Sequence, residues 1–309
     1  MNKKQLIERW NEGEGVIKYN KIMEWLKGNI DDSFIDDSYY YKNKIDLRGI
    51  VFEDFIEIND MNLDNIDFSY CNFNRALMKR CKINDCIYFT CDLSYVSEWQ
   101  CEVSNSTFSK CKIKGSIGIW GGTYNNVVFE KDDLKGVTIG YPDFNNCIFN
   151  NCKLDQVDFN GANFNNVKFI GKLKDVWFRG NYLPNVKLYE KFDKKRAKKS
   201  NDMIVDFSEA QLEYPNFRNN CDLSKVIVPK YGEYLLINDI KDVIEILKTL
   251  INETKEENII NYCEFLLKTR FRVLEEQNMT LVNVEEMKKT AMKYVSIEEF
   301  DNIINKVKQ

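Results

Sequence analysis

The chain has 309 residues, 44% of them hydrophobic, which is enough for two ordinary domains or for one elongated repeat domain with attachments. Its net charge of -4 and its isoelectric point near 5.3 argue against general nucleic-acid binding, which needs excess Lys and Arg along one face. The complete absence of histidine excludes Ser-His and Cys-His nucleophile pairs and imidazole zinc sites, so we expect a non-enzymatic protein with no metal site and no cofactor.

The N-terminal segment, residues 1–42, is predicted to form a helical cap. Its apolar residues include Leu6, Trp10, Ile22 and Trp25. Residues 1–15 contain no apolar run of the signal-peptide kind, and no eighteen apolar residues stand together anywhere. We therefore expect a cytoplasmic protein without a membrane segment.

From residue 61 the sequence repeats with a period of five. The third position of each unit is apolar with one exception, Glu98, and after an interruption at 115–121 the period resumes for ten units, from Tyr124 to Phe169. Neither an α-helix nor a flat strand keeps every fifth residue inside, whereas a coil that turns a corner every five residues does. The interior of this coil is predicted to contain Phe68, Phe73, Ile83, Leu93, Phe144, Phe149, Leu154, Phe159, Phe164 and Phe169.

The units CDLSY (91–95), VDFNG (157–161) and ANFNN (162–166) resemble the consensus of the pentapeptide-repeat family, in which a small residue precedes Asp or Asn and then Leu or Phe. The resemblance covers roughly residues 45–229. It implies a right-handed quadrilateral β-helix with four units per coil. We therefore predict a mainly β protein, with a β-helix over residues 43–230 between an N-terminal helical cap and a C-terminal helical bundle.

Nine of the ten cysteines, all but Cys263, stand at the small first position of a unit. With four units per coil, Cys71, Cys91 and Cys111 would stack on one face. One interpretation is a metal-binding or redox-active ladder. The interpretation that we favour is that these thiols pack as small apolar groups in a crowded core, where cysteines are commonly found and react poorly.

Two carboxylates stand at positions that the repeat places inside, Glu98 at a third position and Asp132 at a first position. A buried, unpaired carboxylate is costly and is therefore a candidate functional group. At Glu98 we expect instead a local bulge that turns the carboxylate outward and leaves the neighbouring Trp99 to pack.

Two interruptions of the repeat are candidate contact sites. Residues 115–122, GSIGIWGG, lack the Lys-Ser or Lys-Thr of a phosphate-binding loop, so we expect a glycine bulge there that exposes Trp120. The interruption at 189–204 contains a basic run, which is either a finger that contacts an anionic partner or a solvated loop. The candidate partner-binding residues are Trp99, Trp120, Lys194, Lys195, Arg196, Lys198 and Lys199.

Helical spacing replaces the period of five in residues 231–309. Apolar residues recur at helical intervals from Ile240 onward, and capping-box patterns begin at Thr254, Asn283 and Ser296. We expect four helices forming a C-terminal helical domain, near residues 238–252, 255–276, 284–294 and 297–308.

These features predict a protein–protein interaction module, a protective, immunity or inhibitor protein that binds a macromolecular target through its rigid β-helix surface and loops. The alternative is a structural adaptor or scaffold. The resemblance also implies a more specific variant, because quinolone-resistance members of the family bind DNA gyrase by imitating duplex DNA. Residues 45–190 argue against that variant, since they hold 19 acidic and 16 basic residues and are nearly neutral. The partner and the oligomeric state stay open.

Overall fold

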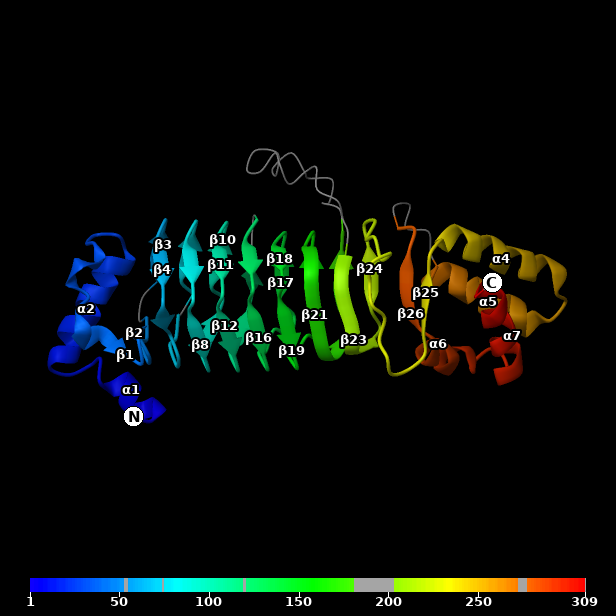
Figure 1. Ribbon diagram of the computed structural model, residues 1–309. Coiled ribbons are helices and arrows are strands. Elements are labelled where there is room, and N and C mark those ends of the chain that lie inside the picture. Colours follow the sequence, from blue (N-terminus) through cyan, green and yellow to red (C-terminus); the bar gives the residue numbers. More distant parts are fainter. Residues whose placement is uncertain (53–54, 74, 119–120, 181–202, 272–276, 309) are drawn as a thin grey trace.

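The computed structural model describes residues 1–309 except 53–54, 74, 119–120, 181–202, 272–276 and 309. The described chain forms a rod of stacked β-coils with helices at both ends (Figure 1). The predicted fold class, a β-helix flanked by helical segments, is therefore confirmed.

The N-terminal end of the rod is covered by short helices. Asn2 caps the first of them through a capping box with Gln5. Trp10 and Trp25 are buried and join the hydrophobic core of the rod, so this helical segment closes the first coil. The elements are α1 (Lys3–Glu8), α2 (Glu14–Leu26), the 3₁₀ turns η1 (Asp32–Phe34) and η2 (Asp37–Tyr39), and β1 (Tyr40–Tyr41).

Each corner of the coil is a left-handed residue at the fifth position of a unit. Asn65, Asp85 and Asn105 have φ angles of 57°, 50° and 49°, and even the β-branched Thr90 has φ of 57°. Asn and Asp tolerate this conformation best. As predicted for the paired asparagines, the second Asn of each pair occupies such a corner, as Asn126 does.

Successive units contribute to four sheet faces, and equivalent strands of successive coils pair in parallel. The first face comprises β4 (Asn62–Asp64), β7 (Lys82–Asn84), β11 (Glu102–Ser104), β15 (Thr123–Asn125), β18 (Asp143–Asn145) and the first parts of β21 (Asn163–Lys174) and β23 (Met203–Glu213). The second face comprises β2 (Lys44–Asp46), β5 (Ile66–Asp67), β8 (Ile87–Phe89), β12 (Thr107–Ser109), β16 (Val128–Glu130), β19 (Ile148–Asn150) and later parts of β21 and β23.

The third face is less regular than the first two. It comprises β9 (Asp92–Ser94), β13 (Lys112–Lys114) and single bridges such as that between Asp133 and Lys153. The fourth face comprises β3 (Glu57–Asn59), β6 (Leu77–Lys79), β10 (Ser97–Trp99), β14 (Ser116–Ile117), β17 (Thr138–Gly140), β20 (Asp158–Asn160), β22 (Trp177–Arg179) and β24 (Asn216–Arg218). Because the faces follow one another around the coil, the fourth face lies opposite the second.

The interior of the rod is a column of stacked rings and branched aliphatic side chains. The ring centre of Phe149 lies 4.7 Å from that of Phe129 and 4.9 Å from that of Phe169, one coil away on either side. The ten residues predicted for the interior are all buried, and Leu93 is the most exposed of them at 7%. One large side chain per unit therefore fills the coil.

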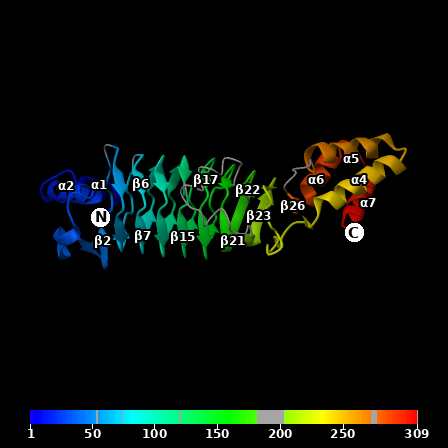
Figure 2. The same cartoon turned by 90° about the horizontal axis from the view of Figure 1, so that it is seen from above.

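The C-terminal end carries helices and one strand pair that the sequence did not predict. The antiparallel pair β25 (Tyr234–Ile237) and β26 (Thr280–Asn283) lies between the rod and the helices (Figure 1), and Figure 2 shows β26 in the same place from above. Leu281 joins the core of the rod. All four expected helices are present, although α5 ends earlier than predicted. They are α4 (Ile240–Glu253), α5 (Glu257–Thr269), α6 (Val284–Ala291) and α7 (Ile297–Val307). Among the described residues, none of the helices is long and apolar enough to cross a membrane.

Candidate functional site

The fourth face of the rod, which we name the tryptophan face, carries an exposed ring beside a cation. Trp99 ends β10, and 39% of its surface is exposed. The Lys79 ammonium, one coil away on β6, lies 5.9 Å from the centre of the Trp99 ring, and its Nζ lies 2.5 Å from Oε1 of Glu57. This end of the face therefore presents an aromatic ring next to a cation that a carboxylate holds in place.

The prediction that Glu98 turns outward through a bulge is wrong. Glu98 keeps its place in β10, paired in register with Met78, and only 8% of its surface is exposed. No bulge is needed because the Tyr124 hydroxyl donates a hydrogen bond to the carboxyl group inside the rod. Since strand neighbours point to opposite sides, the inward Glu98 leaves Trp99 on the outside.

A second aromatic and basic cluster lies further along the same face. The Trp177 ring on β22 lies near two guanidinium groups, with its centre 4.8 Å from Cζ of Arg179 and 5.5 Å from Cζ of Arg218. Arg179 Nε also lies 2.9 Å from Oδ1 of Asp158. We did not single out this cluster from the sequence, although the period makes Phe178 the inward residue and therefore places Trp177 and Arg179 outside.

The two clusters are spaced along the rod with a stretch of small side chains between them. From β10 to β22 the face advances through β14, β17 and β20, which is four steps of about 4.8 Å, or roughly 19 Å. Gly140 on β17 lies within this interval. The tryptophan face therefore carries two Trp-centred clusters about 19 Å apart along the rod.

The remaining predicted contact residues lie outside the described part of the chain. Trp120 belongs to the gap at 119–120. The basic residues Lys194, Lys195, Arg196, Lys198 and Lys199 belong to the gap at 181–202, which follows β22 in the sequence. Of the seven candidate partner-binding residues, Trp99 is the one that the structure places.

The first face carries a ladder of asparagine side chains near one corner. Asn105 donates from Nδ2 to Oδ1 of Asn84 at 2.8 Å, and Asn126 donates in turn to Asn105 at 3.1 Å. The ladder continues through Asn146 and Asn166, with donor–acceptor distances of 3.2 and 2.8 Å. Because these amides bind one another across successive coils, the ladder stabilises the stacking of the coils.

All ten cysteines are buried, and none of them forms a disulfide bond. The thiols of Cys91 and Cys111 donate to backbone carbonyl oxygens of the preceding coil, at 3.0 Å to Phe68 and 3.2 Å to Tyr88. Burial raises the pKa of the Cys86 thiol to about 12. Burial and hydrogen bonding both favour the interpretation that these cysteines pack the core.

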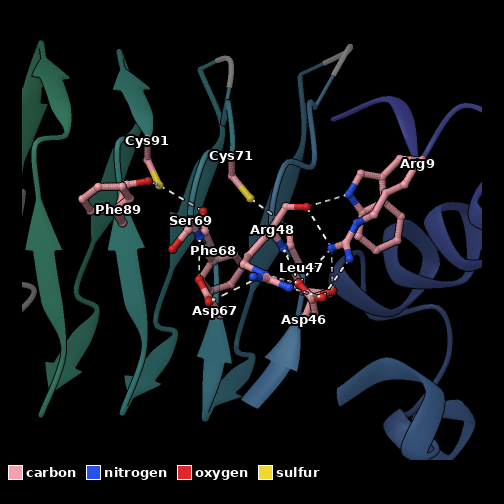
Figure 3. A network of polar contacts seen from close by, with 11 residues as sticks. Arg9, Asp46, Leu47, Arg48, Asp67, Phe68, Ser69, Cys71, Phe89 and Cys91 are labelled. Atoms are coloured by element: carbon pink, nitrogen blue, oxygen red, sulfur yellow. Dashed lines mark hydrogen bonds and ion pairs between the residues drawn. The ribbon is translucent and has the colours of Figure 1, made fainter. Parts of the chain in front are cut away.

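A network of charged groups joins the N-terminal helices to the first coils (Figure 3). Arg9 Nη1 lies 2.7 Å from Oδ2 of Asp46, and Arg48 Nε lies 2.8 Å from Oδ1 of the same carboxylate. Although burial favours the neutral form of Asp46, the hydrogen bonds and charges of the two arginines hold its pKa well below the usual range. We assign this network to attachment of the helices, because its charges are satisfied within it.

The repeat seen in the structure matches a known sequence family. A family model described as pentapeptide repeats matches residues 133–171 with eight copies, and these residues lie within the regular coils described above. The chain therefore contains pentapeptide repeats. No curated protein matches this pentapeptide-repeat chain.

Solved structures of other pentapeptide-repeat proteins are similar to it. HetL, involved in heterocyst differentiation regulation in the cyanobacterium Nostoc sp. strain PCC 7120, is 12% identical over 62% of this chain and 92% of its own, with a TM-score of 0.25. Full-length QnrB1, a plasmid-mediated fluoroquinolone resistance protein, is 12% identical over 56% of this chain and 92% of its own, with a TM-score of 0.20. Rfr23 from the cyanobacterium Cyanothece 51142 is 11% identical over 56% of this chain and 90% of its own, with a TM-score of 0.14.

Proposed function

We propose that this pentapeptide-repeat protein is a non-enzymatic interaction module that binds a protein target through its tryptophan face. The observation that carries the proposal is the placement of Trp99 and Trp177 on one face of the rod, each beside a basic side chain. Trp and Arg are the residues most enriched among those that dominate binding energy at protein interfaces.

The rigidity of the rod favours recognition of a folded surface. Strand β22 pairs with β20 and β24, and β10 pairs with β6, so the strands that carry Trp177 and Trp99 are held by neighbouring coils. A surface that is ordered before binding loses little conformational entropy when a partner docks. A partner that contacts both Trp-centred clusters has to cover roughly 19 Å of the rod axis.

The charges on the tryptophan face favour a protein partner over nucleic acid. Lys79 and Arg179 are each paired with a carboxylate, Glu57 and Asp158 respectively, so the face carries little net positive charge. Nucleic-acid binding needs several cations free to neutralise phosphates. A protein surface that combines apolar groups with a few carboxylates is the better complement.

The more specific role that we propose is protection, immunity or inhibition, exerted in the cytoplasm. A rigid surface acts on a target by covering it, which requires no catalytic group. This role predicts that binding depends on the side chains of the tryptophan face. An adaptor that uses its helical ends would bind its partners independently of those side chains, and the two roles are therefore distinguishable.

The proposal is tested by capture from a lysate of the native host with three forms of the full chain. These are the unaltered protein, the variant with Trp99→Ala and Trp177→Ala, and the control Phe89→Ala. Phe89 is a matched control because it lies on the opposite second face with the Lys110 ammonium 5.4 Å from its ring. Thermal unfolding measured by circular dichroism establishes that each form is folded.

The expected result is one protein captured in a fixed ratio by the unaltered chain and by Phe89→Ala, and lost with the double variant. The purified partner should then bind with at least about tenfold lower affinity to the double variant, since each dominant Trp contributes about 2 kcal/mol or more. Equal capture by the double variant would assign the contact to another surface. Absence of any reproducible partner would refute the proposed interaction module.

A further inference from the structure

A cavity lies where the rod meets the C-terminal helices. Helices α5 and α6 line it together with Tyr214, which follows β23, and its volume is about 220 Å³. Both oxygens of Glu286 on α6 lie 3.0 Å from the backbone nitrogen of Tyr214, so the same carboxylate that lines the cavity attaches the helices to the rod. We name this space the junction cavity.

One wall of the junction cavity is apolar. It is formed by Phe265 and Leu266 of α5 and by Met287 of α6. The Tyr294 ring packs behind this wall, with its centre 5.2 Å from that of Phe265. Such a wall favours an aliphatic or aromatic group over water, because apolar surface is removed from solvent on contact.

The lining of the cavity also contains a guanidinium group, that of Arg270. Arg270 is mostly buried, with 24% of its side chain exposed, and its nearest carboxylate oxygen, Oε2 of Glu286, lies 3.6 Å from Nη2. That separation is too long for a direct hydrogen bond. Within the described part of the chain, the guanidinium group donates no hydrogen bond, and its charge partner there is Glu286, whose oxygens also accept from the Tyr214 backbone nitrogen.

A second polar group in the cavity lining also lacks a partner. The Tyr262 hydroxyl is buried and, within the part of the chain that the structure describes, forms no hydrogen bond. Buried donors left without acceptors cost free energy, and native proteins usually satisfy them with protein, water or ligand. The cavity therefore combines apolar side chains with the partly exposed Arg270 guanidinium group and the buried Tyr262 hydroxyl, neither of which donates a hydrogen bond to a described residue.

We propose that the junction cavity binds a small organic acid whose carboxylate accepts hydrogen bonds from Arg270 and whose apolar body lies against Phe265, Leu266 and Met287. The volume agrees with this ligand class, because 220 Å³ exceeds the roughly 150 Å³ of a protein cavity that holds one benzene molecule. The ring of such an acid takes up a volume like that of benzene, and the remainder leaves room for a short carboxylate chain. The site is separate from the tryptophan face and does not depend on the function proposed for it.

The test is isothermal titration calorimetry on the full chain with phenylacetate, 3-phenylpropionate and hexanoate. Phenylacetamide is the neutral comparison, and acetate is the acid without an apolar body. The variants are Arg270→Gln and Tyr262→Phe. The control variant is Lys268→Gln, which removes an exposed cation of the same helix whose only described contact is with Glu264.

We expect at least one of the three larger acids to bind saturably in a one-to-one ratio, and acetate and phenylacetamide to bind at least about tenfold more weakly. Arg270→Gln should weaken binding by a similar factor, whereas Lys268→Gln should leave it unchanged. Because bound ligand stabilises the folded state, the same acids should raise the melting temperature of the unaltered chain.

Two results would overturn the proposal. One is that none of the three acids binds saturably at millimolar concentration, which would mean that ordered water satisfies Arg270 and Tyr262. The other is that a binding acid keeps its affinity for Arg270→Gln. If Arg270→Gln does not fold, Thr290→Phe replaces it: Thr290 lines the cavity from α6, so a ring there fills the space while Arg270 stays in place. Unchanged binding by this variant would equally refute the site.

Discussion

Inside the rod, the Tyr124 hydroxyl donates a hydrogen bond to the carboxyl group of Glu98. The two residues come from different faces, Tyr124 from β15 and Glu98 from β10, and they meet beside a cavity of about 20 Å³. Burial raises the pKa of Glu98, although the hydrogen bonds from Tyr124 and from the Gly118 backbone oppose the shift. The repeat therefore accommodates an acidic residue in its interior by pairing it and by favouring its neutral form.

The first prediction concerns this acid and pH. A carboxyl group whose pKa is higher in the folded than in the unfolded state stabilises the fold below the unfolded value of 4.5, and that stability is lost as pH rises through the folded pKa. Glu98→Gln keeps the shape and removes the titration. The variant should therefore lose less stability than the unaltered protein between acid and neutral pH.

Urea unfolding at a series of pH values measures this difference. Glu102→Gln, an exposed change on β11, is the control and should follow the unaltered protein. Tyr124→Phe removes the donor and should destabilise by about 1–3 kcal/mol. Parallel stability curves for Glu98→Gln and the unaltered protein would contradict the assignment of Glu98 as a buried titrating acid.

The second prediction concerns Asp132, which replaces a small first-position residue in the column that includes Cys111 and Cys152. Asp132 is fully buried, and its Oδ1 accepts a hydrogen bond from the Cys111 backbone at 2.6 Å. Its Oδ2 has no partner at hydrogen-bond distance among the described residues. Burial raises its pKa from 3.8 to about 7.

Because this pKa is also raised, the stability linked to Asp132 is present below pH 3.8 and is lost as pH rises through about 7. At about 1.4 kcal/mol for each pKa unit, the loss is on the order of a few kcal/mol. Asp132→Asn should abolish it in calorimetric melting curves recorded from acid to neutral pH. The neighbouring Asp133→Asn is the control, because Asp133 pairs with Lys114 at 2.8 Å on the surface. This variant should still lose stability as pH rises towards neutral.

The third prediction concerns attachment of the N-terminal helices. Asp46 has a lowered pKa, so its contribution is present above its unfolded pKa and is lost as pH falls through the folded one. Asp46→Asn should destabilise the protein by about 1–3 kcal/mol at neutral pH, because it weakens the hydrogen bonds from Arg9 and Arg48. The difference should shrink in acid.

Hydrogen exchange followed by mass spectrometry locates this effect. Amides of α1 and α2 should exchange faster in Asp46→Asn, and those of the central coils should not. Glu8→Gln removes an exposed ion pair with Lys4 and should leave exchange unchanged. Uniform acceleration along the whole rod would show that the network stabilises more than the helical attachment.

The period of five was sufficient to predict the interior of the rod and its corners. Each fifth residue has the same environment, so Phe149 and Asn126 can be placed by counting. Counting does not identify hydrogen-bond partners in other coils, and this is why the orientation of Glu98 was predicted wrongly. The Glu98 carboxyl group accepts a hydrogen bond from the hydroxyl of Tyr124, 26 residues later in the chain. A local pattern contains no information about such a pair.

The C-terminal end was less predictable for the same reason. Strands β25 and β26 are only four residues long and are separated by α4 and α5, and segments this short do not distinguish strand from helix by their pattern. The contact between Tyr214 and Glu286 joins residues 72 positions apart. The junction cavity depends on that contact and therefore became visible only in the folded chain.

The last prediction concerns the column of stacked rings. Phe149 is fully buried between Phe129 and Phe169, and its strand β19 is paired on both sides, so the neighbouring coils have little freedom to collapse into a space left by its ring. Phe149→Ala should therefore destabilise by about 3–5 kcal/mol. Phe149→Asp should prevent the rod from folding, because it places an unpaired charge in the same space.

Ile148→Thr is the matched control for this prediction, since Ile148 precedes Phe149 in β19 and faces outward. It should change the free energy of unfolding by no more than about 0.5 kcal/mol in urea titrations. If Phe149→Ala were as mild as Ile148→Thr, the coils would have to close around the missing ring. The paired parallel strands above and below Phe149 oppose such a movement, because closing the space requires breaking hydrogen bonds in two neighbouring coils.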